Sequence, residues 1–174
     1  MISYSASTLA SALTLATRLS DEFEGLSLTA YPDPGTGAEP WTIGRGSTMI
    51  DGRAVQPGDT CTEAQADAWT QDDLRRSMQI IIDDVPVTLN ANQIAALTSM
   101  VNNIGPGYAG VRDGIIWLAD GDHSTLFRCL AAADFKGAAA QIPLWNRSGG
   151  RVMLGLERRR EAELELFLTP ETAP

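Results

Sequence analysis

The sequence predicts an α+β protein in which a small β-rich part near the N-terminus precedes a larger helical part. Apolar residues recur at helical spacing over residues 7–23. Glycine, proline and short runs of β-type residues then dominate residues 25–60, and helical periodicity returns over residues 62–169. Strands separated from helices along the chain are typical of the α+β class. The groove between two such parts is a natural ligand site.

The first helix is predicted from one apolar stripe: Leu9, Leu13, Ala16, Leu19 and Phe23. We expect Ser7 to cap its start and Gly25 to end it. Glu24 therefore lies at a helix C-terminus, where the helix dipole disfavours a negative charge. This position would help to keep a carboxylic acid protonated.

Turn and capping signals place the later elements. Asp51-Gly52 predicts a hairpin turn within a sheet of about three strands. Capping signals at 62–65 and 90–93 predict the starts of two helices. Further helices are expected near 124–132, 135–142 and 154–168, followed by a short tail at 170–174. With 174 residues we expect a single domain, 1–174, and a monomer.

Composition excludes several classes of function. The net charge of −9 argues against nucleic acid as the main partner, because phosphate neutralisation needs clustered basic residues. No nucleotide-binding loop or zinc spacing is present, so we expect no cofactor and no metal. Residues 1–17 lack charge but are too short and too polar to span a membrane, so we expect no stable membrane insertion. Cys61 and Cys129 are expected to be buried thiols, although a single disulfide remains open.

One set of residues has the character of a glycosidase site. Glu24, Asp33 and Thr42 follow one another across the first helix end and the glycine-rich segment. Glycoside cleavage needs an acid to protonate the leaving oxygen and a carboxylate to activate water or stabilise the cationic transition state. A threonine hydroxyl can hold that water. Spacing alone is weak evidence, because surface carboxylates are common among 22 acidic residues.

The motifs around these residues resemble those of phage lysozymes, glycoside hydrolase family 24. The resemblance rests on short motifs in family order: Glu24-Gly25, Tyr31-Pro32-Asp33, Thr42-Ile43-Gly44-Arg45-Gly46, Asn103-Ile104-Gly105, Trp145-Asn146, Gly149-Gly150-Arg151 and Arg158-Arg159-Arg160-Glu161. It implies a lysozyme-like fold whose active-site groove separates the β-rich lobe from the helical lobe.

The resemblance implies a muramidase that hydrolyses the β-1,4 bond between N-acetylmuramic acid and N-acetylglucosamine with inversion. Glu24 would be the general acid, Asp33 would position water or stabilise the cation, and Thr42 would help to hold that water. Asn103 and Arg151 would contact the sugars.

The same resemblance implies a phage endolysin whose partner is the peptidoglycan glycan strand. We expect it in the host cytoplasm, reaching the wall through a separate pore-forming protein; secretion by a weak N-terminal anchor is the less favoured route. A catalytically weak peptidoglycan-binding or phage structural module is the alternative function.

The chain departs from the family pattern at several positions. Ser47 stands where the family often has histidine, so a contact between the lobes is lost or replaced. Eight residues, rather than five, separate Asp33 from Thr42. Asn102 replaces a usual aromatic, and about a dozen extra residues lie between Gly105 and Ser124, which we interpret mainly as core packing.

Three more assignments concern residues outside the proposed catalytic set. Trp41, Trp117 and Trp145 are interpreted as mainly structural. His123 is expected on the surface. The basic run at 158–160 is expected on a solvated face, with one arginine turned toward an acid.

Overall fold

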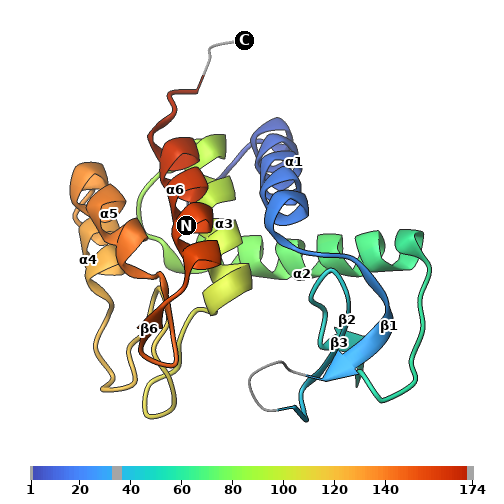
Figure 1. The fold of residues 1–174 in the computed structure, drawn as a ribbon. Helices are drawn as coiled ribbons and strands as arrows, with labels where there is room; N and C mark the ends of the chain where they lie inside the picture. The colour runs from blue at the N-terminus through green and yellow to red at the C-terminus, as the bar shows by residue number, and fades with distance from the viewer. Residues whose placement is uncertain (1, 33–36, 172–174) are drawn as a thin grey trace.

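The structure is a computed structural model that describes residues 2–32 and 37–171. It confirms the predicted α+β class and the division into a β-rich part and a larger helical part (Figure 1). The helices are α1 (Ala6–Phe23), α2 (Glu63–Asp84), α3 (Ala91–Ile104), α4 (Thr125–Ala131), α5 (Phe135–Gln141), the 3-10 turn η1 (Ile142–Leu144) and α6 (Leu154–Leu168). The strands are β1 (Ser27–Pro32), β2 (Trp41–Gly44), β3 (Met49–Ile50), β4 (Arg53–Ala54), β5 (Arg147–Ser148) and β6 (Arg151–Val152).

The helix starts follow their capping residues. Capping boxes pair Thr62 with Gln65 at α2 and Asn90 with Gln93 at α3, as predicted. The predicted cap of α1 is wrong, because Ser5 rather than Ser7 accepts a hydrogen bond from the backbone N–H of Thr8. The first helix therefore begins one residue before its predicted start.

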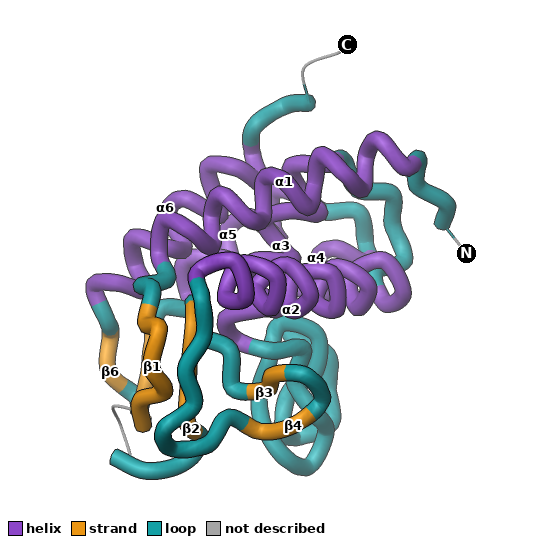
Figure 2. The backbone as a smooth tube through the Cα atoms, turned by 90° about the vertical axis from the view of Figure 1, so that its right-hand side faces the viewer, coloured by secondary structure: helices purple, strands orange, loops and turns teal. Residues whose placement is uncertain are grey.

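The β-rich part consists of two antiparallel hairpins instead of one sheet of about three strands (Figure 2). The predicted turn joins β3 to β4, with Asp51 at φ 49° and Gly52 at φ 80°. Two left-handed residues in succession match the right-handed twist of a hairpin. A second turn of this kind, Gly149 at φ 55° and Gly150 at φ 76°, joins β5 to β6 and was not predicted.

Helix α2 joins the two parts of the molecule (Figure 1). Its N-terminal portion covers β2, where Trp69 packs beside the small apolar cluster of Ile43, Ile50 and Val55. Its C-terminal portion contributes Leu74, Met78 and Ile81 to the main core. Helix α3 lies at the centre of that core and packs on α1, α2 and α6.

The segment between α3 and α4, residues 106–123, is partly core and partly surface. Ile115 and Ile116 are buried in the helical core, which confirms the expected packing for that stretch. His123 was expected on the surface, and this expectation is wrong. It is half-buried and stacks between Trp117 and Phe127, with ring centroids 3.9 and 4.3 Å away.

The structure also bears on the expectations for the cysteines, the tryptophans and a membrane span. Cys61 and Cys129 are free thiols, so no disulfide joins them, and both are half-buried rather than buried. Trp41 packs on the β-rich cluster and Trp145 on the helical core, as expected. Trp117 remains 37% exposed. Across residues 2–32 and 37–171, no helix is both long and apolar enough to cross a membrane.

We predict that Gly107→Ala strongly destabilises the protein. Gly107 has φ +85°, and a Cβ there would lie 2.0 Å from the carbonyl oxygen of Trp117. Backbone strain together with this overlap should cost about 3 kcal/mol or more in urea unfolding. Gly110→Ala is the matched control, because Gly110 has φ +76° with open space around it and should cost about 1 kcal/mol. Equal losses for the two variants would contradict the close approach.

Candidate active site

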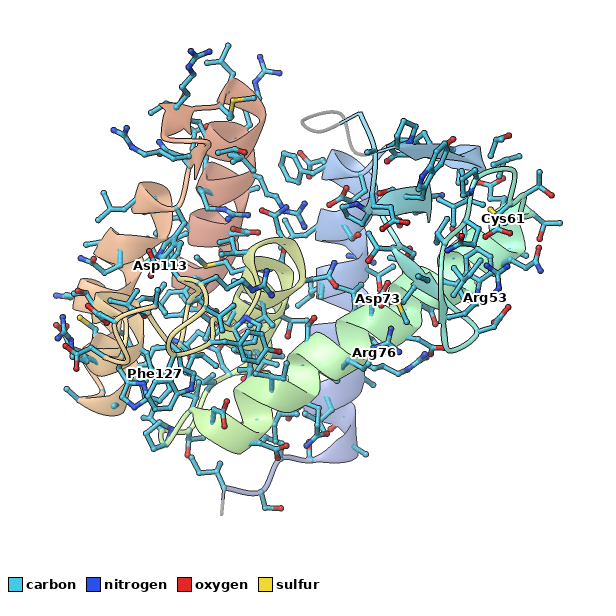
Figure 3. The ribbon with its side chains drawn as sticks, turned by 90° about the horizontal axis from the view of Figure 1, so that it is seen from below. Arg53, Cys61, Asp73, Arg76, Asp113 and Phe127 are labelled. Atoms are coloured by element: carbon cyan, nitrogen blue, oxygen red, sulfur yellow. The ribbon has the colours of Figure 1, made fainter. Side chains whose placement is uncertain are left out.

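A groove of about 910 Å³ runs between the β-rich part and the helical part. Its walls come from the end of α1, the β2–β4 segment, α2, the end of α3 and the 106–123 segment. The lining residues include Glu24, Gly46, Thr48, Asp51, Trp69, Asp73, Arg76, Asn103, Tyr108 and Arg112. Figure 3 shows Asp73 and Arg76 on α2, the helix that crosses from one part to the other.

Glu24 is fixed at the groove by the end of α1. Its backbone N–H donates to the carbonyl oxygen of Ser20 at 2.8 Å, and its side chain is 26% exposed. The guanidinium of Arg159 donates to Oε1. Oε2 faces Gly46, where a Cβ would lie 3.4 Å from that oxygen. One carboxylate oxygen is therefore held by a cation, and the other lies beside a residue without a side chain.

Arg159 belongs to a buried charge network on α6. Its Nε donates to Glu163 Oε1 at 3.3 Å, and its Nη2 donates to Ser99 Oγ at 3.4 Å. Arg160 also pairs with Glu163, with 2.6 Å between Nε and Oε2, and donates to Asn103 Oδ1 at 2.9 Å. The chain of contacts therefore links Glu24 at one end to Asn103 at the other.

This network contains two carboxylates and two guanidiniums, so its formal charges balance. Removal from water disfavours the ionised forms of Glu163 and Arg160, so burial raises the pKa of Glu163 and lowers the pKa of Arg160. The opposite charge of the partner works against both shifts. Ser99 supplies a further hydrogen bond to Glu163 at 2.7 Å.

The Gly44-Arg45-Gly46-Ser47 segment holds the opposite wall against α2. A Cβ on Gly44 would lie 2.9 Å from that of Ala66, so this glycine permits close contact with the helix. Arg45 Nε donates to Asp67 at 2.8 Å. Ser47 Oγ donates to Asp73 at 3.0 Å, so the position where the family often has histidine contacts α2.

The predicted catalytic residues are only partly visible together. Glu24 lies in the groove, and Asp33 lies outside the described residues. Thr42 is not among the described residues that line the groove, but it pairs directly across from Tyr31 on β1. The pKa of Tyr31 is raised by burial and then by the negative charge of Glu24.

Of the two residues predicted to contact the sugars, only one is among the described residues that line the groove. Asn103 lines the groove and accepts a hydrogen bond from Arg160. Arg151 lies on β6 and is exposed, and it is not one of the described residues lining this groove. The two residues therefore do not meet in one site within the described part of the chain.

The phage lysozyme family matches residues 21–163, which include α1's end, both walls of the groove and the Glu163 network. The chain belongs to this family. Its relatives include the endolysin of an Acyrthosiphon pisum secondary endosymbiont phage, 33% identical over 83% of this chain and 89% of that protein. The SAR-endolysin of Escherichia phage N15 is 34% identical over 82% of this chain and 72% of that protein.

Some relatives are longer than the matched region. The endolysin of Bacillus phage B103 is 34% identical over 86% of this chain, and the match spans about half (51%) of that endolysin. Solved structures agree with the fold. The endolysin of Escherichia coli O157:H7 phage FAHEc1 superposes with a TM-score of 0.69 at 26% identity, covering 96% of this chain and 94% of that one. The muramidase domain of SpmX from Asticaccaulis excentricus gives 0.69 at 28% identity, covering 89% and 95%.

The burial of Arg159 and Arg160, in the basic run on α6, was not predicted from the sequence. We expected a solvated face with one arginine turned toward an acid, but both Arg159 and Arg160 are buried and both pair with Glu163. Spacings of three and four residues bring side chains together on a helix, so the run and Glu163 carried a usable signal. Burial itself depends on α3 and α1, which no local pattern reveals.

We predict that Glu163→Gln destabilises the protein by about 3–5 kcal/mol, because it leaves the buried Arg160 without a carboxylate partner and the buried Arg159 with Glu24 alone. Glu161→Gln is the control, since Glu161 is exposed on the same helix and should change stability by less than about 0.5 kcal/mol. Guanidinium unfolding of both variants measures the difference. Similar midpoints would show that the network contributes little to folding.

Proposed function

We propose that this chain is a peptidoglycan hydrolase of the muramidase type that cleaves the β-1,4 bond between N-acetylmuramic acid and N-acetylglucosamine. The observation that carries the proposal is the position of Glu24, with one oxygen held by Arg159 and the other facing the groove beside Gly46. Membership of the phage lysozyme family and the endolysin relatives support the same activity.

In the proposed reaction, Glu24 acts as general acid through Oε2. This oxygen has no hydrogen-bond partner among the described residues, so it is the one that can carry a proton toward the glycosidic oxygen. As the bond from the anomeric carbon to that oxygen breaks, the proton passes to the leaving sugar. The resulting carboxylate is stabilised where it forms, because the Arg159 guanidinium already donates to Oε1.

Water completes the cleavage by attacking the anomeric carbon from the opposite face and losing its surplus proton to solvent, which gives inversion. Asp33 is proposed to position this water or stabilise the developing cation, and Thr42 to hold the water. Thr42 pairs with Tyr31 on β1, the strand that begins three residues after Glu24, and this pairing supports the proposed position of that hydroxyl. Asn103 is proposed to contact the sugar from the groove wall, and Arg151 to contact substrate beyond it.

The biological setting is proposed from the relatives. The chain would act as one lysozyme-like domain and a monomer, as a phage or prophage endolysin that degrades the host wall at lysis. The proposed route is host cytoplasm followed by release through a separate pore-forming protein, with secretion by the N-terminal segment as the alternative. The relative named as a SAR-endolysin supports the alternative route.

We predict that Glu24→Gln folds normally and loses lytic activity by about 10²–10⁴-fold, because a carboxamide cannot donate the proton. Turbidity of outer-membrane-permeabilised cells measures the rate. Glu22→Gln is the control, since Glu22 is exposed and lies two residues before Glu24, and it should keep most activity. Retention of more than about a tenth of the parent rate by Glu24→Gln would overturn the assignment of Glu24 as the acid. Absence of lysis by the parent itself would instead favour a non-catalytic peptidoglycan-binding module.

We predict that the product carries a free reducing end on muramic acid. A second carboxylate and a hydroxyl that hold water favour hydrolysis over attack by the sugar's own hydroxyl. Mass spectrometry of digested sacculi separates the two outcomes, because internal attack gives 1,6-anhydro muramic acid, which is lighter by one water. Mainly anhydro products would reject the hydrolytic mechanism while leaving Glu24 as the acid.

A further inference from the structure

The 106–123 segment presents an ordered cation to the groove. Arg112 lies over the ring of Tyr108, with its guanidinium carbon 5.5 Å from the ring centroid. The guanidinium also packs over Gly105, where a Cβ would lie 2.7 Å from Nη2. Reciprocal backbone hydrogen bonds between Tyr108 and Arg112, at 2.9 and 3.0 Å, close the loop that carries both residues. Tyr108 and Arg112 are therefore positioned together, although Tyr108 is 54% exposed.

Arg112 differs from Arg45 and Arg76, the other arginines among the described residues that line the groove, because no acid pairs with it. Arginines at positions 45, 53, 75, 76, 159 and 160 each pair with an aspartate or glutamate. Within residues 2–32 and 37–171, Arg112 has no ion pair. Its neighbour Asp113 is used inside the loop, where Oδ1 accepts from the backbone N–H of Ala119 at 2.7 Å. Figure 3 places Asp113 well away from Arg76 and α2.

A second arginine faces the same space from α2. Arg76 and Arg112 both line the main groove and a smaller hollow of about 260 Å³ that shares residues with it. The guanidinium of Arg76 pairs with Oδ1 of Asp73. The other carboxylate oxygen, Oδ2, accepts a hydrogen bond from the hydroxyl of Ser47. Arg76 is thus held in place with its charge partly balanced, while the charge of Arg112 is unbalanced.

We propose that Arg112, assisted by Arg76, binds a carboxylate of the peptide stem attached to the glycan strand. This inference rests on the proposed muramidase function. The N-acetylated sugars of the strand are uncharged, and the lactyl group of muramic acid is tied up in an amide, so the stem peptides supply the carboxylates. Guanidinium groups suit carboxylates because their donors form a planar fork. The acids Glu24, Asp51 and Asp72, which line the groove elsewhere, would repel such an anion and favour this end.

The test measures binding rather than cleavage, so that it does not depend on the activity. In the Glu24→Gln background, purified sacculi are used either untreated or with their carboxylates converted to amides by carbodiimide and ammonium. Co-sedimentation gives the apparent Kd. We expect Arg112→Gln to weaken binding to untreated sacculi about threefold to tenfold relative to its parent, and to leave binding to amidated sacculi unchanged. Arg112→Lys, which keeps the charge but not the fork, should give an intermediate loss.

Arg128→Gln is the matched control, because Arg128 is exposed on α4, away from the groove lining. It should behave like the parent on both kinds of sacculi. Equal weakening by Arg112→Gln on untreated and amidated sacculi, or no weakening on either, would overturn the proposal. Loss of the thermal unfolding transition in Arg112→Gln, with Arg112→Lys folded and binding both sacculi equally, would overturn it too. Failure of the muramidase assignment would appear separately, as absence of lytic activity in the parent chain with Glu24 intact.

Discussion

The burial of Glu163 between Arg159 and Arg160 is the constraint on which the rest of the site depends. A carboxylate removed from water is costly unless charges and hydrogen bonds replace the solvent, and here two guanidiniums and Ser99 do so. The same arginines then extend outward, one to Glu24 and the other to Asn103. The acid at the groove is therefore set by an electrostatic balance in the core of the helical part.

The opposite wall is fixed by different physics. It depends on close packing and a few directional contacts between the β2–β3 segment and α2. Gly44 allows the backbone to approach Ala66, Arg45 pairs with Asp67, and Ser47 bonds to Asp73. Because α2 also contributes to the helical core, this one helix positions both walls of the groove. The width of the groove thus follows from how the two ends of α2 are packed.

Local signals predicted much of this fold and less of its site. Capping boxes, apolar stripes and the Asp51-Gly52 turn placed most elements, because each depends on a few neighbouring residues. The resemblance to phage lysozymes pointed to Glu24 and Asn103. The burial of Arg159, the stacking of His123 and the free cation of Arg112 were not predicted, since each is decided by what distant segments bring beside it.

The contact between Glu24 and Arg159 joins residues 135 positions apart in the chain. During synthesis the acid emerges early and its cationic partner emerges near the end, so the pair cannot exist until α6 has been made and docked. Glu24 is therefore present in the growing chain well before the contact that orients its side chain can form. A chain interrupted before α6, or cut within it, retains Glu24 but loses the charge that orients it.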